Sequence, residues 1–259
     1  MKELLNNLYS YRQLLKSNVQ KDIRGKYKGS FLGILWSFIN PLLLTLVYAI
    51  VFSVIMKSTE DNYVTFLIIA ILPWNYFSTT ITQGTTSILM NAGIIKKIYF
   101  PREILPVSIN TSGLINYLIS CIIIVIFLIF SGIGFSWYIV FFPFIVLTQY
   151  ILQQAIIFIT SAIEIYVRDF EYIITFIMNL LFYATPILYA SEAFADSKFG
   201  FIVKLNPMAT VINSYRDIFY YQSMPRIKAL IVVFLMSCVL LYVGLKIFKA
   251  LEKGFAEEV

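Results

Sequence analysis

The sequence predicts an all-α integral membrane protein. We expect six transmembrane helices, an N-terminal amphipathic interface helix and a re-entrant outer helical hairpin between the fifth and sixth spans. Hydrophobic residues fill 59% of the 259 positions and charged residues only 13%, which is more apolar surface than a soluble domain of this length buries. Asp, Glu, Lys and Arg are absent from 29–56, 62–95, 104–163, 172–191 and 229–245. A helix of about 20 mostly apolar residues crosses the hydrocarbon core, and these stretches lack the alternation of a β-barrel.

The stretch 104–163 is long enough for two crossings, and Ser131-Gly132-Ile133-Gly134 offers a turn between them. The six spans are therefore expected at 31–56, 64–90, 104–130, 137–165, 172–190 and 229–249. We interpret the chain as a single domain over 1–259, in which a cytoplasmic amphipathic helix (1–30) precedes the membrane domain (31–249) and a cytoplasmic tail (250–259) follows it.

The segment before the first span has helical periodicity. Apolar residues repeat every three or four positions and form one face: Leu4, Leu8, Tyr11, Leu15, Val19 and Ile23. Polar residues form a separate row: Lys16, Gln20, Arg24 and Lys28. This pattern predicts an amphipathic helix at the membrane surface. No small-residue cleavage site follows the first apolar run, so we expect that run to stay as an anchor.

The distribution of basic residues predicts the orientation in the membrane. With these spans, fourteen of the 20 Lys and Arg residues fall on the side that holds both termini. Basic residues near short loops stay in the cytoplasm, so both ends are expected there. On the outer side, Asn206-Pro207 signals a helix start, and an apolar stripe follows that predicts a helix dipping into the outer leaflet: Met208, Val211, Ile212, Tyr215 and Phe219.

Several kinds of chemistry are excluded or disfavoured. The chain has no histidine, which removes the usual general base and histidine metal sites, and it has no phosphate-binding G-x-x-x-x-G-K-[ST] loop. Cys121 and Cys238 lie inside apolar spans, where no metal site or disulfide framework is implied. The net charge of +6 is explained by cytoplasmic basic residues rather than by nucleic acid. Glu164 is the only acidic residue within the spans, which disfavours an enzyme or an ion-coupled carrier.

Several motifs, taken in order, resemble one transporter family. They are residues 24–37 with Asn40-Pro41-Leu42-Leu43, then Leu72-Pro73-Trp74-Asn75-Tyr76-Phe77, Ile95 to Glu103, Tyr166-Val167-Arg168-Asp169-Phe170, and Leu205-Asn206-Pro207-Met208 with Tyr215-Arg216-Asp217. Together they are similar to the type-2 ABC transporter permeases, above all those that export O-antigen polysaccharides or teichoic acids.

The resemblance implies a homodimeric permease in the bacterial cytoplasmic membrane, with one ATP-hydrolysing subunit beneath each copy. This assembly would move an undecaprenyl-diphosphate-linked polysaccharide outward. ATP and Mg would belong to the partner subunits, and this chain itself would hold no cofactor, metal or catalytic site. The alternative from another class is a membrane-embedded transferase or a lipid flippase that acts without ATP. The motifs do not separate O-antigen from teichoic acid.

The resemblance also implies an ATPase-coupling loop. Its residues are Ile95, Lys96, Lys97, Ile98, Tyr99, Phe100, Pro101 and Arg102. The interpretation without a docking role is a basic cytoplasmic turn. The loop is too apolar for a solvated turn, so we favour a docking helix with Tyr99 and Phe100 as its anchors. The interface helix, with Arg24, Tyr27 and Lys28, would anchor to anionic lipid, contact the ATPase, or do both.

Three further groups have both a structural and a functional interpretation. Aromatic residues within the spans either pack against lipid and helices or line a conduit, as we suggest for Trp36, Tyr48, Phe52 and Tyr183. Glu164, Arg168 and Asp169 form either an ion-paired helix end, or a cytoplasmic gate or site for the diphosphate head. Lys198, Lys204 and Arg216 are either surface charge or an outer rim that favours phosphate groups.

Overall fold

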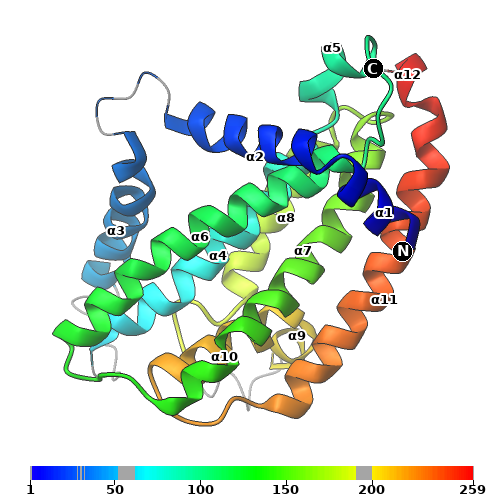
Figure 1. Cartoon of the computed structure of the whole chain (residues 1–259). Coiled ribbons are helices and arrows are strands. Elements are labelled where there is room, and N and C mark those ends of the chain that lie inside the picture. Colours follow the sequence, from blue (N-terminus) through cyan, green and yellow to red (C-terminus); the bar gives the residue numbers. More distant parts are fainter. Residues whose placement is uncertain are drawn as a thin grey trace.

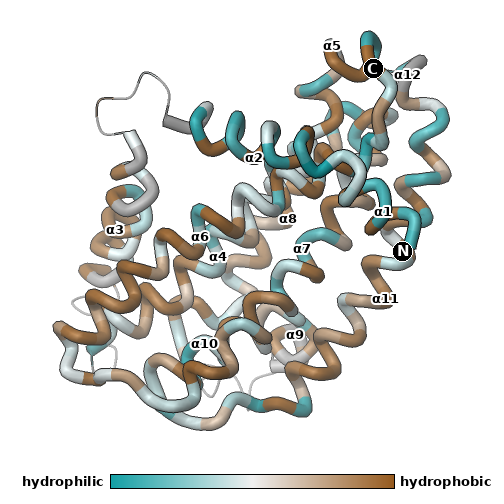
Figure 2. Tube along the Cα trace, in the orientation of Figure 1, coloured by the Kyte–Doolittle hydropathy of each residue, from teal (hydrophilic) through white to brown (hydrophobic). Residues whose placement is uncertain are grey.

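The computed structural model describes residues 2–27, 29, 31, 33–51, 62–190 and 200–258, and every regular element in these ranges is helical. Four long helices are apolar enough to cross a membrane: α4 (Tyr63–Thr85), α6 (Ile104–Phe130), the pair η4 (Trp137–Phe141) and α7 (Phe142–Glu164), and α11 (Ile227–Leu251). They lie side by side as an inclined bundle (Figure 1), and Figure 2 shows that their residues are largely hydrophobic. The all-helical membrane fold is therefore confirmed.

Two further apolar helices are shorter than the predicted spans. The first, α3 (Trp36–Ala49), follows the short turn η1 (Gly33–Leu35), and residues 52–61 of the expected 31–56 span and following loop lie outside the described part. The second, α8 (Phe170–Ala184), ends well before residue 190. Thr185 has an extended backbone (φ −107°, ψ 138°) and precedes Pro186, whose ring disfavours helical geometry at the residue before it.

The expected single N-terminal helix is two helices. α1 (Lys2–Ser10) and α2 (Arg12–Tyr27) are separated by a turn at Tyr11. Leu4 and Val19 are buried, and α2 packs along α6. Figure 1 shows the two helices lying across one end of the bundle. The apolar stripe that we read as membrane-facing therefore covers, at these positions, the protein's own helices.

The opposite end of the bundle carries α9 (Gly200–Leu205) and α10 (Pro207–Phe219). The predicted start of α10 is confirmed, because the Asn206 side chain accepts a hydrogen bond of 2.9 Å from the Met208 backbone N–H. All five residues of the predicted stripe are buried: Met208, Val211, Ile212, Tyr215 and Phe219. Burial of this face holds α10 against α4 and α7.

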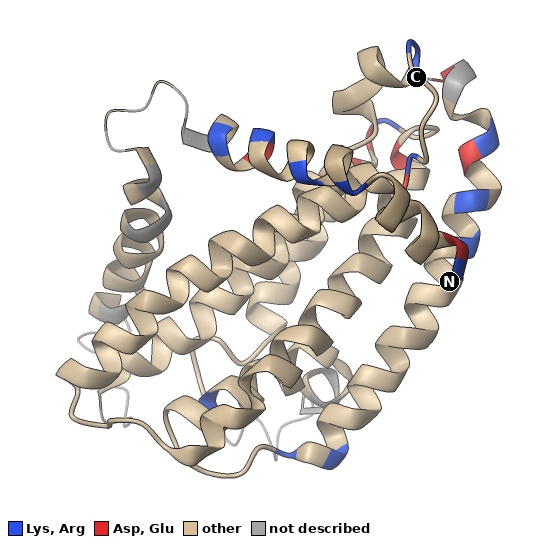
Figure 3. Ribbon diagram, viewed as in Figure 1, with Lys and Arg blue, Asp and Glu red and all other residues tan. Residues whose placement is uncertain are grey.

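The residues after α11 fold back instead of forming a free tail. η6 (Glu252–Gly254) and α12 (Phe255–Glu258) follow α11, and the Phe255 side chain is fully buried. The Tyr166 hydroxyl donates a 2.8 Å hydrogen bond to the Leu251 carbonyl oxygen. The short helices η3 (Leu89–Asn91) and α5 (Ala92–Ile95) lie at this same end of the molecule. Figure 3 shows that charged side chains gather there, around α1, α2 and α12.

Candidate functional site

A stripe of polar residues follows one face of α4 and its C-terminal end. It consists of Asn75, Ser78, Thr79, Thr82, Gln83 and Thr86, and we call it the α4 stripe. The spacing of three and four residues places these side chains above one another on a helix. From Thr65 to Thr85, every residue that is not buried belongs to this stripe. The open face of the most buried spanning helix is therefore entirely polar and uncharged from Thr65 to Thr85.

The polar groups of the α4 stripe are only partly satisfied by the protein. Thr79 donates to the Asn75 carbonyl oxygen, and Thr82 donates to the Ser78 carbonyl oxygen at 3.0 Å. The side-chain amides of Asn75 and Gln83 have no hydrogen-bond partner among the described residues. Hydrocarbon cannot supply one, so such a face lines a watery space or meets another protein surface.

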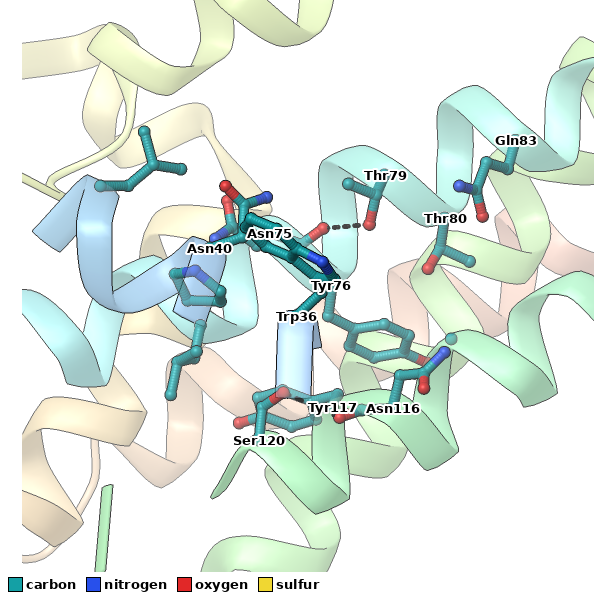
Figure 4. Close-up of a pocket in the computed structure, with 14 residues that line it drawn as sticks. Trp36, Asn40, Asn75, Tyr76, Thr79, Thr80, Gln83, Asn116, Tyr117 and Ser120 are labelled. Atoms are coloured by element: carbon teal, nitrogen blue, oxygen red, sulfur yellow. Dashed lines mark hydrogen bonds between the residues drawn. The ribbon is translucent and has the colours of Figure 1, made fainter. Parts of the chain in front are cut away.

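At the end that carries Gln83 and Thr86, the stripe borders a cavity of about 360 Å³ that Lys21 and Asp22 also line. Two further cavities open beside Asn75. The larger one, about 580 Å³, lies between α3, α4 and α6 and is called the α6-side cavity (Figure 4). The smaller one, about 280 Å³, lies between α3, α4 and α8 and is called the α8-side cavity. Leu44 and Asn75 line both, so the two are neighbours. No acidic or basic side chain lines either cavity within the described part of the chain.

Three of the four predicted conduit residues border these cavities. Trp36 lines the α6-side cavity, whereas Tyr48 and Tyr183 line the α8-side cavity. Tyr48 stacks on Phe182 with ring centroids 5.6 Å apart. Phe52 lies outside the described residues. The α4 stripe is not among the residues predicted from the sequence, although its repeat of polar residues inside a hydrophobic run is visible there.

A buried polar layer behind α4 sets the rotation of the stripe. Gln149 of α7 donates a 2.8 Å hydrogen bond to the Pro73 carbonyl oxygen and accepts one of 3.0 Å from the Tyr215 hydroxyl of α10. Gln153 donates to the Tyr76 carbonyl oxygen at 3.2 Å. These bonds hold one side of α4 against α7 and α10, so the opposite side, which carries the stripe, faces outward from the subunit.

The residues suggested as a gate are not brought to either cavity. Glu164 is buried, whereas Arg168 and Asp169 are exposed in the turn between α7 and α8. Arg168 donates to the Glu258 carbonyl oxygen at 3.4 Å. The alternative of an ion-paired helix end is also not observed, because no salt bridge joins these three residues, all of which the structure describes.

The predicted coupling loop divides into an exposed and a buried part. Ile98 and Tyr99 are 63% and 91% exposed, and Lys96 and Lys97 are exposed as well. Phe100, in contrast, is only 5% exposed and packs in a core cluster with Ile95, Ile104 and Phe248. The expectation that Phe100 is a docking anchor is therefore wrong, because its ring is already buried within the subunit.

The end of this loop is fastened to both ends of the chain. Arg102 donates from its side chain to the Glu252 carbonyl oxygen at 2.6 Å and from its backbone N–H to the Glu252 carboxylate at 3.2 Å. The next residue, Glu103, is buried and accepts a 2.9 Å hydrogen bond from the Asn7 side chain. Pro101 is half-buried between these contacts. The loop thus has a fixed base and an exposed tip.

The predicted outer rim needs a correction at Arg216. Its side chain is only 1% exposed, and it donates to the carbonyl oxygens of Pro186, Ile187 and Tyr189, at 2.6 Å for Ile187 and 3.1 Å for Tyr189. Its guanidinium also lies 3.5 Å from the centre of the Phe66 ring. Arg216 therefore fastens the segment after α8 to α10 and is not a surface charge.

Several other predicted residues lie beyond what the structure describes. Lys198 and Lys28 fall in undescribed positions, and so do the side chains of Lys204 and Tyr27. Arg24 of the predicted interface helix is described and exposed on α2.

Comparison with known proteins agrees with the helical membrane architecture. Residues 13–220 match the profile of the family described as ABC-2 type transporter. The chain is similar to the O-antigen export system permease protein RfbA of Myxococcus xanthus, with 35% identity over 260 residues and full coverage of both chains. It is also similar to the protein of the same name from Klebsiella pneumoniae, with 36% identity over 255 residues that cover 97% of this chain and 96% of the relative.

Proposed function

This chain belongs to the ABC-2 type transporter family as a membrane permease subunit, and from that premise we propose that it exports an O-antigen-type polysaccharide carried on a lipid diphosphate. ATP is hydrolysed by a separate subunit in this family. We propose a homodimer of this chain with two such subunits on its cytoplasmic side, in the cytoplasmic membrane.

The observation that carries the proposal is the uncharged α4 stripe. Amide and hydroxyl groups exchange hydrogen bonds with sugar hydroxyls and with water, whereas a buried charge would bind one ion and hold it. A long neutral polymer can therefore move past the stripe without a deep binding site. Among the described residues, no acidic or basic side chain lines the α6-side or the α8-side cavity, which favours a neutral saccharide over an anionic teichoic acid.

A second copy of the chain would close the open side of the stripe. Exposed apolar residues flank the stripe on α3 and α8: Leu43, Leu46 and Val47 on the former, and Ile173, Phe176 and Leu180 on the latter. Such faces meet either lipid or another protein surface. If α3 and α8 meet their counterparts in a dimer, the two stripes face one watery conduit and neither contacts lipid.

The membrane topology that we propose has six crossings with both termini in the cytoplasm. α3 and α8 supply the other two crossings, and α8 is short, because its 15 residues span only about 22 Å. Both ends of the chain lie at the charge-rich end of the bundle, which fits the cytoplasmic side. α9 and α10 then form a re-entrant hairpin from the outer side.

The ATPase would dock on the exposed tip of the coupling loop. Exposed apolar residues lie on the loop and just before it, namely Met90, Ile94, Ile98 and Tyr99, beside Lys96 and Lys97. An exposed apolar patch with a basic rim is typical of a protein-docking surface. Because the base of the loop is bound to Asn7 and Glu252, a push at the tip would reach both α1 and the end of α11.

The test of the conduit is a matched pair of threonine substitutions. Thr79 and Thr175 are both exposed, and each donates to the carbonyl oxygen four residues earlier, but only Thr79 lies on the α4 stripe. We expect Thr79→Leu to lower the amount of polymer at the cell surface about tenfold, which corresponds to ~1.4 kcal/mol in the transport barrier. Thr175→Leu should leave it unchanged.

The readout is quantitative blotting of surface polymer in cells that carry the complete export system, together with the amount of permease in the membrane. Copurification of the ATPase should be equal in both variants. Equal export by Thr79→Leu and Thr175→Leu would contradict the conduit assignment.

A further inference from the structure

The α6-side cavity extends sideways from the α4 stripe to a wall formed by α6. This wall consists of Gly113, Asn116, Tyr117 and Ser120, and Figure 4 shows it opposite Thr79, Thr80 and Gln83 of α4. α6 approaches α4 closely at Gly113, where a Cβ atom would lie 3.1 Å from the Tyr76 ring and would also collide with the Thr80 hydroxyl. The cavity is therefore a recess beside the stripe.

Two asparagines of α6 differ sharply in their hydrogen bonds. Asn110 is buried and fully engaged, since it donates to the Tyr150 carbonyl oxygen and to Gln154, each at 3.1 Å, and accepts from the Tyr76 hydroxyl at 3.1 Å. Both amide atoms of Asn116 are also buried, yet neither has a hydrogen-bond partner among the described residues. A buried amide without partners is costly, and Asn116 lines the cavity.

The rest of the cavity has the chemistry of a sugar site. Amides of Asn40, Asn75 and Gln83 offer donors and acceptors, and the indole of Trp36 offers an aromatic face. A pyranose presents hydroxyl groups at its edge and C–H groups on its faces, which match amides and an aromatic ring respectively. The volume of about 580 Å³ lies within the range of small-molecule sites.

The same lining disfavours the charged part of a lipid-linked substrate. A diphosphate or a carboxylate is bound by Arg, Lys or clustered backbone N–H groups. Among the described residues, the lining contains no Lys or Arg, and its α4 and α6 walls are helical, so most of their backbone N–H groups are already bonded. The cavity is thus suited to an uncharged unit.

We propose that the α6-side cavity is a specificity subsite that takes one uncharged sugar residue of the polymer, and that Asn116 recognises its hydroxyl groups. This inference rests on the proposed function, because the sugar reaches the cavity from the conduit along the α4 stripe. The conduit carries the polymer, whereas the recess discriminates among sugar residues.

The test is photo-crosslinking in cells that export the native polymer. A benzophenone amino acid is placed at one of three positions: Ser120 in the α6 wall, Ser78 on the stripe in the α8-side cavity, and the exposed Ile122 of α6, which lines neither cavity. We expect polymer on the permease with the probe at Ser120 and at Ser78, and only lipid with the probe at Ile122.

The three positions separate the possible failures. Polymer at Ser78, with only lipid or a second permease copy at Ser120, would overturn the subsite while the conduit stands. Polymer at neither position would overturn both the subsite and the proposed function.

A substitution gives an independent readout. Asn116→Leu has nearly the same volume but no hydrogen-bonding group, so we expect export of the native polymer to fall about tenfold, which corresponds to the loss of roughly one hydrogen bond to the sugar. Ile122→Leu is the control on the same helix. Membrane abundance and ATPase copurification should be unchanged in both variants, and normal export by Asn116→Leu would overturn the role of Asn116.

Discussion

Arg216 is buried and fastens the segment after α8 to α10, so replacing it tests these contacts directly. The guanidinium donates to three carbonyl oxygens in the segment after α8 and covers the Phe66 ring. Replacing Arg216 with Met keeps much of its length but removes all donors and the charge. The carbonyl oxygens of Pro186, Ile187 and Tyr189 would then lose these donors in a buried place.

The magnitude follows from these contacts. A hydrogen bond from a charged donor contributes about 1.5–3 kcal/mol, and a desolvated cation–π contact contributes about 2 kcal/mol. These contributions overlap, so we expect Arg216→Met to cost about 3–5 kcal/mol, as when a buried charged network loses one partner. For a chain of this size that cost lowers Tm by roughly 6–20 °C. The Tm of Arg216→Lys should lie between those of the unchanged protein and Arg216→Met, because an ammonium lacks the planar fork of donors.

The assay is thermal unfolding of the purified permease in one detergent, followed by the fraction that stays monodisperse. Lys228→Met is the control, since Lys228 is exposed in the first turn of α11. If Arg216→Met lowers Tm by no more than Lys228→Met, the guanidinium does not stabilise α10 and our account of this residue is incorrect.

Three other predictions follow from the described contacts. Tyr99→Ala should lose about 2 kcal/mol of ATPase docking in a copurification titration, whereas Phe100→Ala should instead destabilise the permease by about 3–5 kcal/mol in thermal unfolding. Gly244→Ala should cost about 1–3 kcal/mol of stability, because a Cβ atom there would lie 2.7 Å from the Ala155 carbonyl oxygen of α7. A cysteine at Ser131 should react with an impermeant thiol reagent from outside the cell, whereas one at Asn91 should not, because basic loops stay inside.

Each of these has a control within the chain. Gly93 has no atom within 4 Å of its would-be Cβ, so Gly93→Ala should leave stability unchanged or raise it slightly. Equal effects of Gly93→Ala and Gly244→Ala would refute the close contact of α7 and α11. Loss of docking in Phe100→Ala without loss of stability would restore Phe100 as an anchor. Labelling at Asn91 rather than Ser131 would reverse the proposed orientation.

Much of the fold could be predicted from the sequence because its signals are local. The bounds of α6 coincide with the predicted span, since they follow from an uninterrupted apolar run between Glu103 and the turn at Ser131. The start of α10 was predicted from Asn206 and Pro207, whose capping geometry involves only neighbouring residues. Length, apolar content and caps determine where a helix can exist, and lipid makes that signal strong.

The face that each helix presents was decided only by tertiary contacts. Tyr99 and Phe100 are adjacent aromatics, yet one is exposed and the other is buried in a cluster that includes Phe248, which lies far along the chain. Arg216 resembles a surface charge until the carbonyl oxygens after α8 are placed around it. The α4 stripe becomes a candidate conduit surface because Gln149 and Gln153 hold the other side of α4. Hydrogen bonds between distant helices fix rotation, and a single sequence records the side chains but not which of them meet.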